Sequence, residues 1–303
     1  MNNTLNLMKH KIAYLIFSAV ILVPGILFLS IDGLKLSIDF TGGSLMKYEN
    51  NKTIKDAELR SVFNSLNIDV ESINTNTSDV TIRTKPIDSK LINEIKDSIA
   101  NKFNNPKLLS FETVGPSVGK ETTKNAFVAL AWASVGILLY IAYAFRNVPK
   151  PYSSFRFGAS AIIAMLHDAF LVLGVFAFLG HYFKIEVDGL FITALLTVVG
   201  FSVHDTIVVF DRIRENLSKL PVSWTFESVV NYSVAETLNR SLATSMTVVM
   251  TLLSLYLLGG ETIKVFVLAM LIGIVSGTYS SIFTASPILV LWEEYILKKR
   301  SRK

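Results

Sequence analysis

A chain of 303 residues, of which 51% are hydrophobic and none is cysteine, is richer in apolar side chains than an ordinary soluble domain. The absence of cysteine excludes disulfides, thiol catalysis and thiolate metal sites. The net charge of +5 invites a nucleic-acid partner, but the charge is distributed along the chain as in a membrane protein.

Six apolar runs are long enough to cross a bilayer as helices, which takes about 20 residues each. They cover residues 12–30, 126–145, 157–180, 190–210, 242–258 and 265–292. The fold class predicted from them is an α-helical polytopic membrane protein with six transmembrane helices. No small-residue cleavage site follows the first run, so we expect a retained anchor rather than a signal peptide.

The basic residues of the short connecting segments fall almost entirely on one side of these helices. With the N-terminus inside, fourteen Lys and Arg residues lie in inner segments, and the short outer loops hold only Lys184 and Lys264. This positive-inside pattern predicts a multi-pass protein of the cytoplasmic (inner) membrane with both termini cytoplasmic, and it makes nucleic acid an unsuitable partner.

The spacing of the runs divides the chain into four parts. Residues 1–30 hold the cytoplasmic N-terminus and the first helix, and residues 31–122 form an extracytoplasmic domain on the periplasmic side. Residues 123–292 form a bundle of five helices, and residues 293–303 are a basic cytoplasmic tail.

Short β-rich runs and two amphipathic helices alternate in the outer domain. Strands are expected at residues 44–49, 70–73, 80–84 and 108–114, with helices from Thr53 to about residue 66 and from Asp88 or Ser89 to about residue 103. The order βαββαβ favours an α+β ferredoxin-like domain between the first and second membrane helices. No catalytic constellation occurs in it, so we expect a binding or lever domain.

The connection between the fourth and fifth runs is polar and longer than the other inner connections. It begins as an extension of the fourth helix that Pro221 ends. Residues 224–234 then have an amphipathic pattern, which predicts a separate helix along the inner membrane surface.

Asp205 is the strongest candidate for a functional residue, because it lies in the apolar fourth run. An ionisable group there costs about 2.5–3.5 kcal/mol on insertion scales, so such residues usually face a bundle interior or an ion path. Asp211 and Arg212 follow at the end of the run, where we expect them to be helix-border charges. Arg240 precedes the fifth run, either as a movable cation that controls the protonation of Asp205 or as a snorkelling residue at the membrane border.

Three further ionisable residues lie within the runs and are candidates for an ion path. His167 and Asp168 stand halfway along the third run, where either a packing pair or an ion path explains them. His204 adjoins Asp205 but points about 100° away on a helix, so it either shuttles protons or bonds a neighbouring helix. No His-Glu-x-x-His zinc motif occurs, and we expect neither a metal nor a cofactor.

Several motifs together resemble the SecF family of the bacterial SecDF protein-export complex, within the RND superfamily of proton-driven transporters. They are Ile38-Asp-Phe-Thr-Gly-Gly43, Val114-Gly-Pro-Ser-Val-Gly119, His167-Asp168, residues 200–216, and Arg240 with Leu257-Leu-Gly-Gly260. Position 204 is often Asn in this family, and here it is His.

The resemblance implies an auxiliary, non-enzymatic subunit of the Sec translocase, in which Asp205 and Arg240 are the proton-relay pair. It implies the partners SecD, the SecYEG channel, YajC, an unfolded translocating polypeptide and membrane lipids. The proton or sodium motive force would drive export, and the sequence leaves the choice of ion open. Two alternatives remain at this point: an RND-type exporter half for lipids or small molecules, and a non-conducting scaffold of the export complex.

Overall fold

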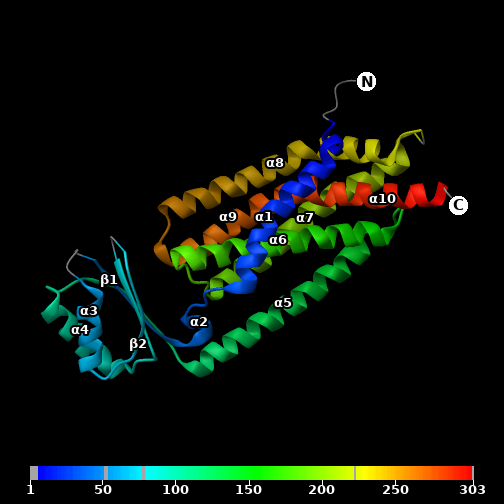
Figure 1. The fold of residues 1–303 in the computed structure, drawn as a ribbon. Coiled ribbons are helices and arrows are strands. Elements are labelled where there is room, and N and C mark those ends of the chain that lie inside the picture. Colours follow the sequence, from blue (N-terminus) through cyan, green and yellow to red (C-terminus); the bar gives the residue numbers. More distant parts are fainter. Residues whose placement is uncertain (1–5, 51–53, 77–78, 222, 302–303) are drawn as a thin grey trace. The chain divides into compact units, whose positions relative to one another are not determined.

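The computed structural model describes residues 6–50, 54–76, 79–221 and 223–301 (Figure 1). The chain divides into two compact units: Met1–Lys35 together with Ala129–Lys303, and Leu36–Val128. The first, called the helical unit below, holds most of the membrane-spanning sequence. The second, called the sheet unit, holds all four strands of the described residues.

The sheet unit is a four-stranded antiparallel sheet with two longer helices. Its strands are β1 (Gly43–Glu49), β2 (Val70–Thr75), β3 (Asp79–Thr84) and β4 (Leu108–Val114), in the order β2-β3-β1-β4. Its helices are the short α2 (Ile38–Thr41), α3 (Asp56–Ser65) and α4 (Ser89–Lys102). All four predicted strands and both predicted helices are present, and Thr53, the predicted start of the first helix, lies outside the described residues.

Apolar side chains alternate along the strands and recur at helical spacing along α4. The apolar face of the sheet therefore packs against the apolar face of the helix. Met46 of β1 lies opposite Ile82 of β3, and both are buried. Ile95 and Ile99, one helical turn apart on α4, are fully buried in the same cluster together with Phe63 of α3. This core holds the helices against one face of the sheet.

All six predicted membrane helices are present, and each begins earlier than hydropathy gave. They are α1 (Lys11–Ile31, preceded by η1, Leu7–His10), α5 (Pro116–Ala144), α6 (Ser154–Phe183), α7 (Gly189–Lys219) and α8 (Phe226–Leu258). The sixth consists of η2 (Glu261–Ile263), α9 (Lys264–Ser280), the π-helical turn η3 (Ser281–Ala285) and α10 (Ser286–Ser301).

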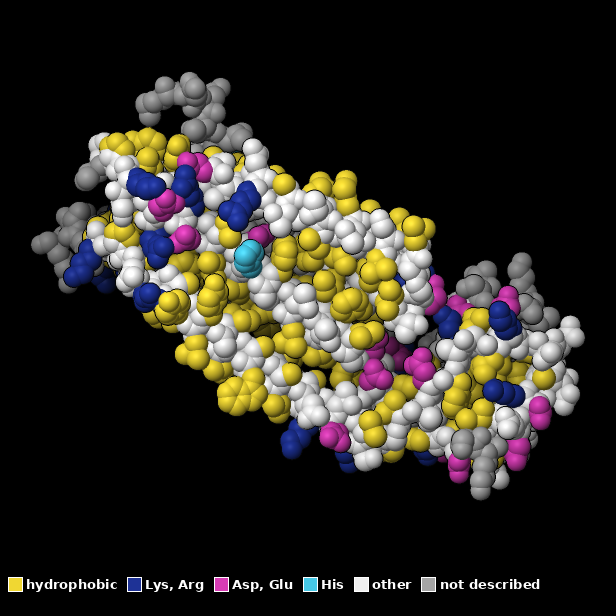
Figure 2. All heavy atoms as spheres, turned by 180° about the vertical axis from the view of Figure 1, so that it is seen from behind, with side chains coloured by type: hydrophobic (Ala, Val, Ile, Leu, Met, Phe, Trp, Pro, Cys, Tyr) yellow, Lys and Arg dark blue, Asp and Glu magenta, His cyan; other side chains and the backbone are white. Residues whose placement is uncertain are grey.

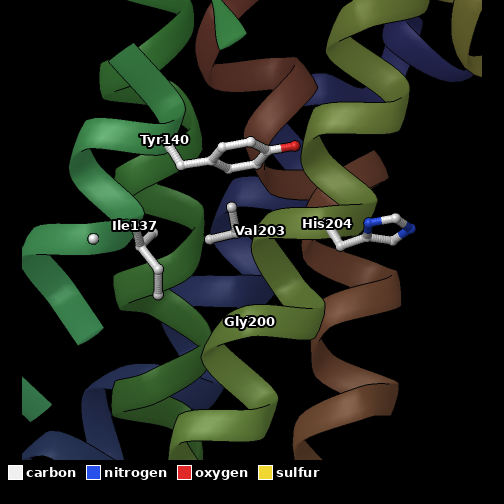
Figure 3. Close-up of a pocket in the computed structure, with 6 residues that line it drawn as sticks. Ile137, Tyr140, Gly200, Val203 and His204 are labelled. Atoms are coloured by element: carbon white, nitrogen blue, oxygen red, sulfur yellow. The ribbon is translucent and has the colours of Figure 1, made fainter. Parts of the chain in front are cut away.

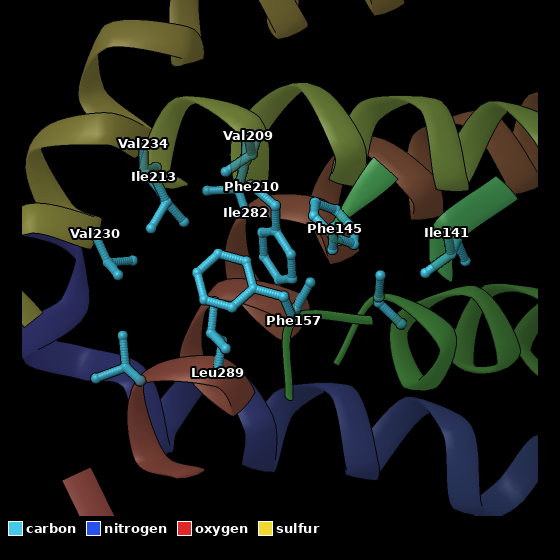
Figure 4. Close-up of a cluster of buried hydrophobic side chains, with 14 of the residues drawn as sticks. Ile141, Phe145, Phe157, Val209, Phe210, Ile213, Val230, Val234, Ile282 and Leu289 are labelled. Carbon is cyan, nitrogen blue, oxygen red and sulfur yellow. The ribbon is translucent and has the colours of Figure 1, made fainter. Parts of the chain in front are cut away.

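Helices α6, α7 and α9 form the interior of the helical unit. In the most apolar stretch of α6 and of α7, 44% of the residues are buried, against 6% for α1. Three phenylalanines close the core where α5, α6 and α7 meet: the ring centroids of Phe157 and Phe210 are 5.5 Å apart, and Phe145 lies within 5.9 Å of both (Figure 4). The outer faces of α1, α5 and α8 form the surface of the helical unit around this core.

Charged side chains gather at one end of the helical unit, as Figure 2 shows for Lys and Arg. The Nζ of Lys11, at the start of α1, lies 2.9 Å from Glu227 of α8 and 2.8 Å from Glu294 of α10. Arg156 of α6 makes two hydrogen bonds of 2.7 and 2.9 Å to the buried Glu293 of α10. These ion pairs bring the beginning of α1 and the end of α10 to the same end of the unit.

The separate surface helix predicted at residues 224–234 is wrong. Residues from Phe226 onward belong to α8, which continues without a break into the fifth membrane helix. Thr225 caps its start by accepting a hydrogen bond from the backbone N–H of Ser228. The polar side chains that suggested a membrane-surface helix instead bond to α7, since Asn216 donates to the hydroxyl of Ser233 at 3.0 Å.

Candidate functional site

Asp205 lies near the middle of α7 and is only 3% exposed. Its Oδ2 atom is buried and has no hydrogen-bond partner among the described residues. A buried polar oxygen without a partner costs free energy, so it calls for a specific explanation. Among the described residues of α7, Asp205 is therefore the one whose buried side-chain oxygen lacks a hydrogen-bond donor.

Arg240 does not contact Asp205 in the structure. Its side chain is exposed and forms no ion pair with the described residues, and its backbone carbonyl accepts a hydrogen bond from Thr244. The two residues nevertheless lie at similar levels on antiparallel neighbours, because the Arg212–Glu236 ion pair fixes the register of α7 against α8. Asp205 lies seven residues before Arg212 on α7, and Arg240 lies four residues after Glu236 on α8. Both lie in the same direction from the ion pair because the helices are antiparallel, so their levels along the helices differ by about 4–5 Å.

The two helix-border charges take part in ion pairs. Asp211 is exposed and lies 2.5 Å from Arg214 on the next turn of α7. Arg212 bonds both carboxylate oxygens of Glu236 on α8, at 2.7 and 2.8 Å, and also Glu215. Sequence reasoning missed Glu236, because its role depends on the register between two helices that only the packed structure defines.

His204 faces outward beside a cavity rather than into the bundle. The cavity, of about 330 Å³, is lined by residues of α5 and α7: Gly136, Ile137, Tyr140, Gly200, Val203 and His204. Figure 3 shows the imidazole directed away from Ile137 and Tyr140. His204 is exposed and makes no hydrogen bond to the described residues, so no neighbouring helix of this chain holds it.

Asp168 is the centre of a buried polar cluster between α6, α7 and α9. Its Oδ1 accepts hydrogen bonds from Nδ1 of His167 at 3.0 Å and from Ser276 at 2.6 Å. Its Oδ2 accepts from Ser202 at 2.6 Å and from Ser280 at 2.5 Å. The carboxylate thus ties three helices together. The sequence singled out His167 and Asp168 but gave no sign of the three serines, which come from two other helices.

Among the described residues, no group of three or more His, Cys, Asp or Glu side chains is placed to hold a metal ion. Asp168 and Asp205 are single carboxylates that form no ion pair with a Lys or Arg among the described residues.

Comparison with known proteins places the chain among protein-export components. The family model "Protein export membrane protein SecD/SecF, C-terminal" matches residues 94–295. The protein translocase subunit SecF of Thermobaculum terrenum is 47% identical, over 95% of this chain and 94% of that one. The SecF of Anaerolinea thermophila is 41% identical over the same shares. The chain belongs to the SecD/SecF family of protein-export membrane proteins.

Longer relatives carry SecD and SecF in one chain, and this SecF-family chain spans only part of them. The translocase subunit SecDF of Bacillus subtilis is 33% identical over 95% of this chain and 38% of its own length. The crystal structure of SecDF from Thermus thermophilus superposes with a TM-score of 0.83 at 31% identity, over 97% of this chain and 39% of that one. The chain is a translocase subunit and, with its six apolar helices, a multi-pass protein of the inner membrane.

The outward face of α8 carries a line of polar side chains through this SecF-family helical unit. Arg240, Thr244, Thr247, Thr251 and Ser254 are all exposed and are spaced by four, three, four and three residues. The four hydroxyls each donate to a carbonyl of their own helix, at 2.7–2.9 Å. We call these five residues the polar seam. Helices with such spacing of small polar residues pack well against other membrane helices.

Proposed function

We propose that the chain couples the proton motive force to the export of unfolded polypeptides through the Sec translocase, with Asp205 as the group that takes up and releases the proton. The observation that carries the proposal is the buried, unpartnered carboxyl oxygen of Asp205 within an apolar helix. A carboxyl group in that setting is most stable when protonated, because burial disfavours its charged form.

Arg240 supplies the second half of the proposed relay. A guanidinium stays charged at every working pH, so it stabilises an ionised Asp205 when it approaches and favours proton uptake when it leaves. The level of Arg240 along α8 supports this role, and its exposed side chain supports a relay that is completed only when another subunit covers α8.

SecD is the proposed subunit that covers the polar seam and His204. An Arg and a His exposed in the membrane would face lipid in the isolated chain, which is costly, whereas a second membrane bundle would shield them. The SecDF relatives, whose single chains span more than twice this length, support the pairing. The SecYEG channel, YajC, the translocating polypeptide and lipids are the further proposed partners, and no enzymatic activity is proposed.

The proposed topology places both termini in the cytoplasm and the sheet unit outside. Its support is the charged end of the helical unit, where Lys11 meets Glu294 and where most of the short-loop Lys and Arg residues lie. We propose the boundaries 1–30, 31–122, 123–292 and 293–303 for the domains. A ferredoxin-like sandwich is proposed for the outer domain, supported by its βαββαβ order and the strand order β2-β3-β1-β4.

The test is gradient-dependent export in membrane vesicles that carry the chain with SecD. Asp205→Asn keeps the size and hydrogen bonding of the side chain but removes its charge, so the gradient-dependent part of export should disappear. Asp211→Asn is the matched control, because Asp211 is an exposed carboxylate on the same helix. Arg240→Met should be inactive and Arg240→Lys partly active. Normal gradient-dependent export by Asp205→Asn, with SecD still co-purifying, would leave only a scaffold role.

A further inference from the structure

A cavity of about 440 Å³ lies between α1, α6 and α9 of the helical unit. Most of the side chains that line it are apolar, and Phe17, Ile21 and Val275 among them are 41–53% exposed. Since these residues lie on membrane helices, the cavity opens towards the lipid. Ligand sites in proteins usually have volumes of about 300–1,000 Å³ and apolar walls with a few polar groups. The cavity therefore suits a small apolar molecule that enters from the bilayer.

One polar atom of the lining side chains lacks a partner. Of the four polar side chains that line the cavity, three are hydrogen-bonded to other residues: Ser18, Ser276 and Tyr279. The fourth is His167, which is 7% exposed and whose Nε2 atom is buried without a hydrogen-bond partner among the described residues. Leaving a buried polar atom unpaired costs free energy, so a ligand that pairs with Nε2 gains what the empty cavity forgoes.

The other ring nitrogen of His167 determines what Nε2 can bind. Nδ1 lies 3.0 Å from Oδ1 of Asp168, and a carboxylate oxygen only accepts hydrogen bonds, so Nδ1 carries the proton. A charged imidazole would place a second, unpaired N–H beside apolar walls, and the neutral form avoids this cost. In the neutral form Nε2 is an acceptor, so its partner must be a hydrogen-bond donor.

We infer that the cavity binds a lipophilic alcohol, a molecule with an apolar body and a hydroxyl group that donates to Nε2 of His167. A plain acyl chain would fit the walls but leave Nε2 unpaired, and an ether or ester offers Nε2 only further acceptors. An anionic headgroup is unsuitable, because no Lys or Arg is among the described residues that line the cavity. A water molecule needs two to four polar partners, which these walls do not offer. The inference does not rest on the proposed role of Asp205.

The experiment is photoaffinity labelling of the purified full-length chain in phosphatidylcholine nanodiscs. The probe is a dodecanol with a photoreactive diazirine at the end of its chain, and its methyl ether is the matched probe without a donor. We expect the alcohol to label the cavity-lining peptides of α1 and α9 saturably. The ether should label them about fivefold less, the factor that a net hydrogen bond of about 1 kcal/mol gives. Both probes should label the α5 peptide around Trp132 equally, because that residue is 73% exposed and outside the cavity.

Variants separate the hydrogen bond from the cavity itself. His167→Phe keeps a ring of similar shape but removes the acceptor, so the alcohol and the ether should label α1 and α9 equally. Val275→Trp fills the open side of the cavity without touching the polar cluster, and should reduce labelling there to background. Val135→Trp is the matched control, since Val135 is a 45% exposed residue of α5 and does not line the cavity. If His167→Phe does not fold, Val275→Trp and the comparison of the two probes still decide.

Unlabelled competitors identify the kind of alcohol. Stronger competition by dodecanol would assign an aliphatic hydroxyl, and stronger competition by dodecylphenol a phenolic one, and either result supports the site. Competition by neither compound would overturn the inference. So would equal labelling of α1 and α9 by the alcohol and the ether in the wild-type chain, which is the result for a cavity filled by any acyl chain. A preference for the alcohol that survives in His167→Phe, or full labelling in Val275→Trp, would also overturn it.

Discussion

Replacing Gly174 by Ala tests how tightly α1 packs on α6. A Cβ atom at Gly174 would lie 2.6 Å from Cα and 2.8 Å from the carbonyl carbon of Gly25 on α1. Both neighbours are backbone atoms, so no side-chain rotation relieves the clash. Ordinary carbon–carbon contacts are about 3.5–4.0 Å, and α1 must therefore move away from α6 by about 1 Å. Such overpacking costs roughly 1–3 kcal/mol.

Gly200→Ala is the matched control within the same bundle. A Cβ atom at Gly200 would meet nothing within 4 Å, so this change brings only the preference of a helix for Ala, which is about 1 kcal/mol. Thermal unfolding of the purified chain in detergent should show a lower Tm for Gly174→Ala and an unchanged or higher Tm for Gly200→Ala. Equal Tm values for the two variants would refute the close approach of α1 to α6.

Three further outcomes are expected from other parts of the chain. Arg156→Met leaves Glu293 buried without its counter-charge and should cost about 3–5 kcal/mol in unfolding, while an unchanged Tm would contradict the ion pair. Burial raises the pKa of Tyr48 to about 12, so its contribution to stability is present below about pH 10 and lost as the pH rises towards 12. Tyr48→Phe should remove that alkaline loss, measured by hydrogen exchange of β1. Labelling of cysteines in Asn76→Cys and Ser301→Cys should occur from outside only for the first, and outside labelling of the second would contradict the topology.

Hydropathy was enough to predict the six membrane helices, because length and apolar composition determine a spanning helix with little help from packing. It could not predict where they end. The polar residues around Arg240 suggested a membrane border, yet α8 runs unbroken from Phe226, because Ser233 and Glu236 bond to α7. Helix ends set by contacts between helices cannot be found from the composition of either one.

The candidate site was predictable only in part, because its contacts between helices are likewise not visible in the composition of any one helix. The burial of Asp205 and Asp168 follows from single carboxylates within apolar runs, and both are buried. The partners of Asp168 do not follow, because serines are common in membrane helices and nothing local marks Ser202 or Ser280 as its donors. The approach of Arg240 to Asp205 stays a prediction, since Arg240 is exposed and pairs with no acidic residue among the described ones.

Proton flux through the assembled complex tests the central proposal most directly. The chain and SecD would be reconstituted in liposomes holding a pH-sensitive dye, with an imposed membrane potential and an unfolded substrate polypeptide. We expect inward proton flux with the wild-type chain and with Asp211→Asn, and no flux above that of empty liposomes with Asp205→Asn. Equal flux in Asp205→Asn and wild type would contradict the assignment of Asp205 as the proton-carrying group.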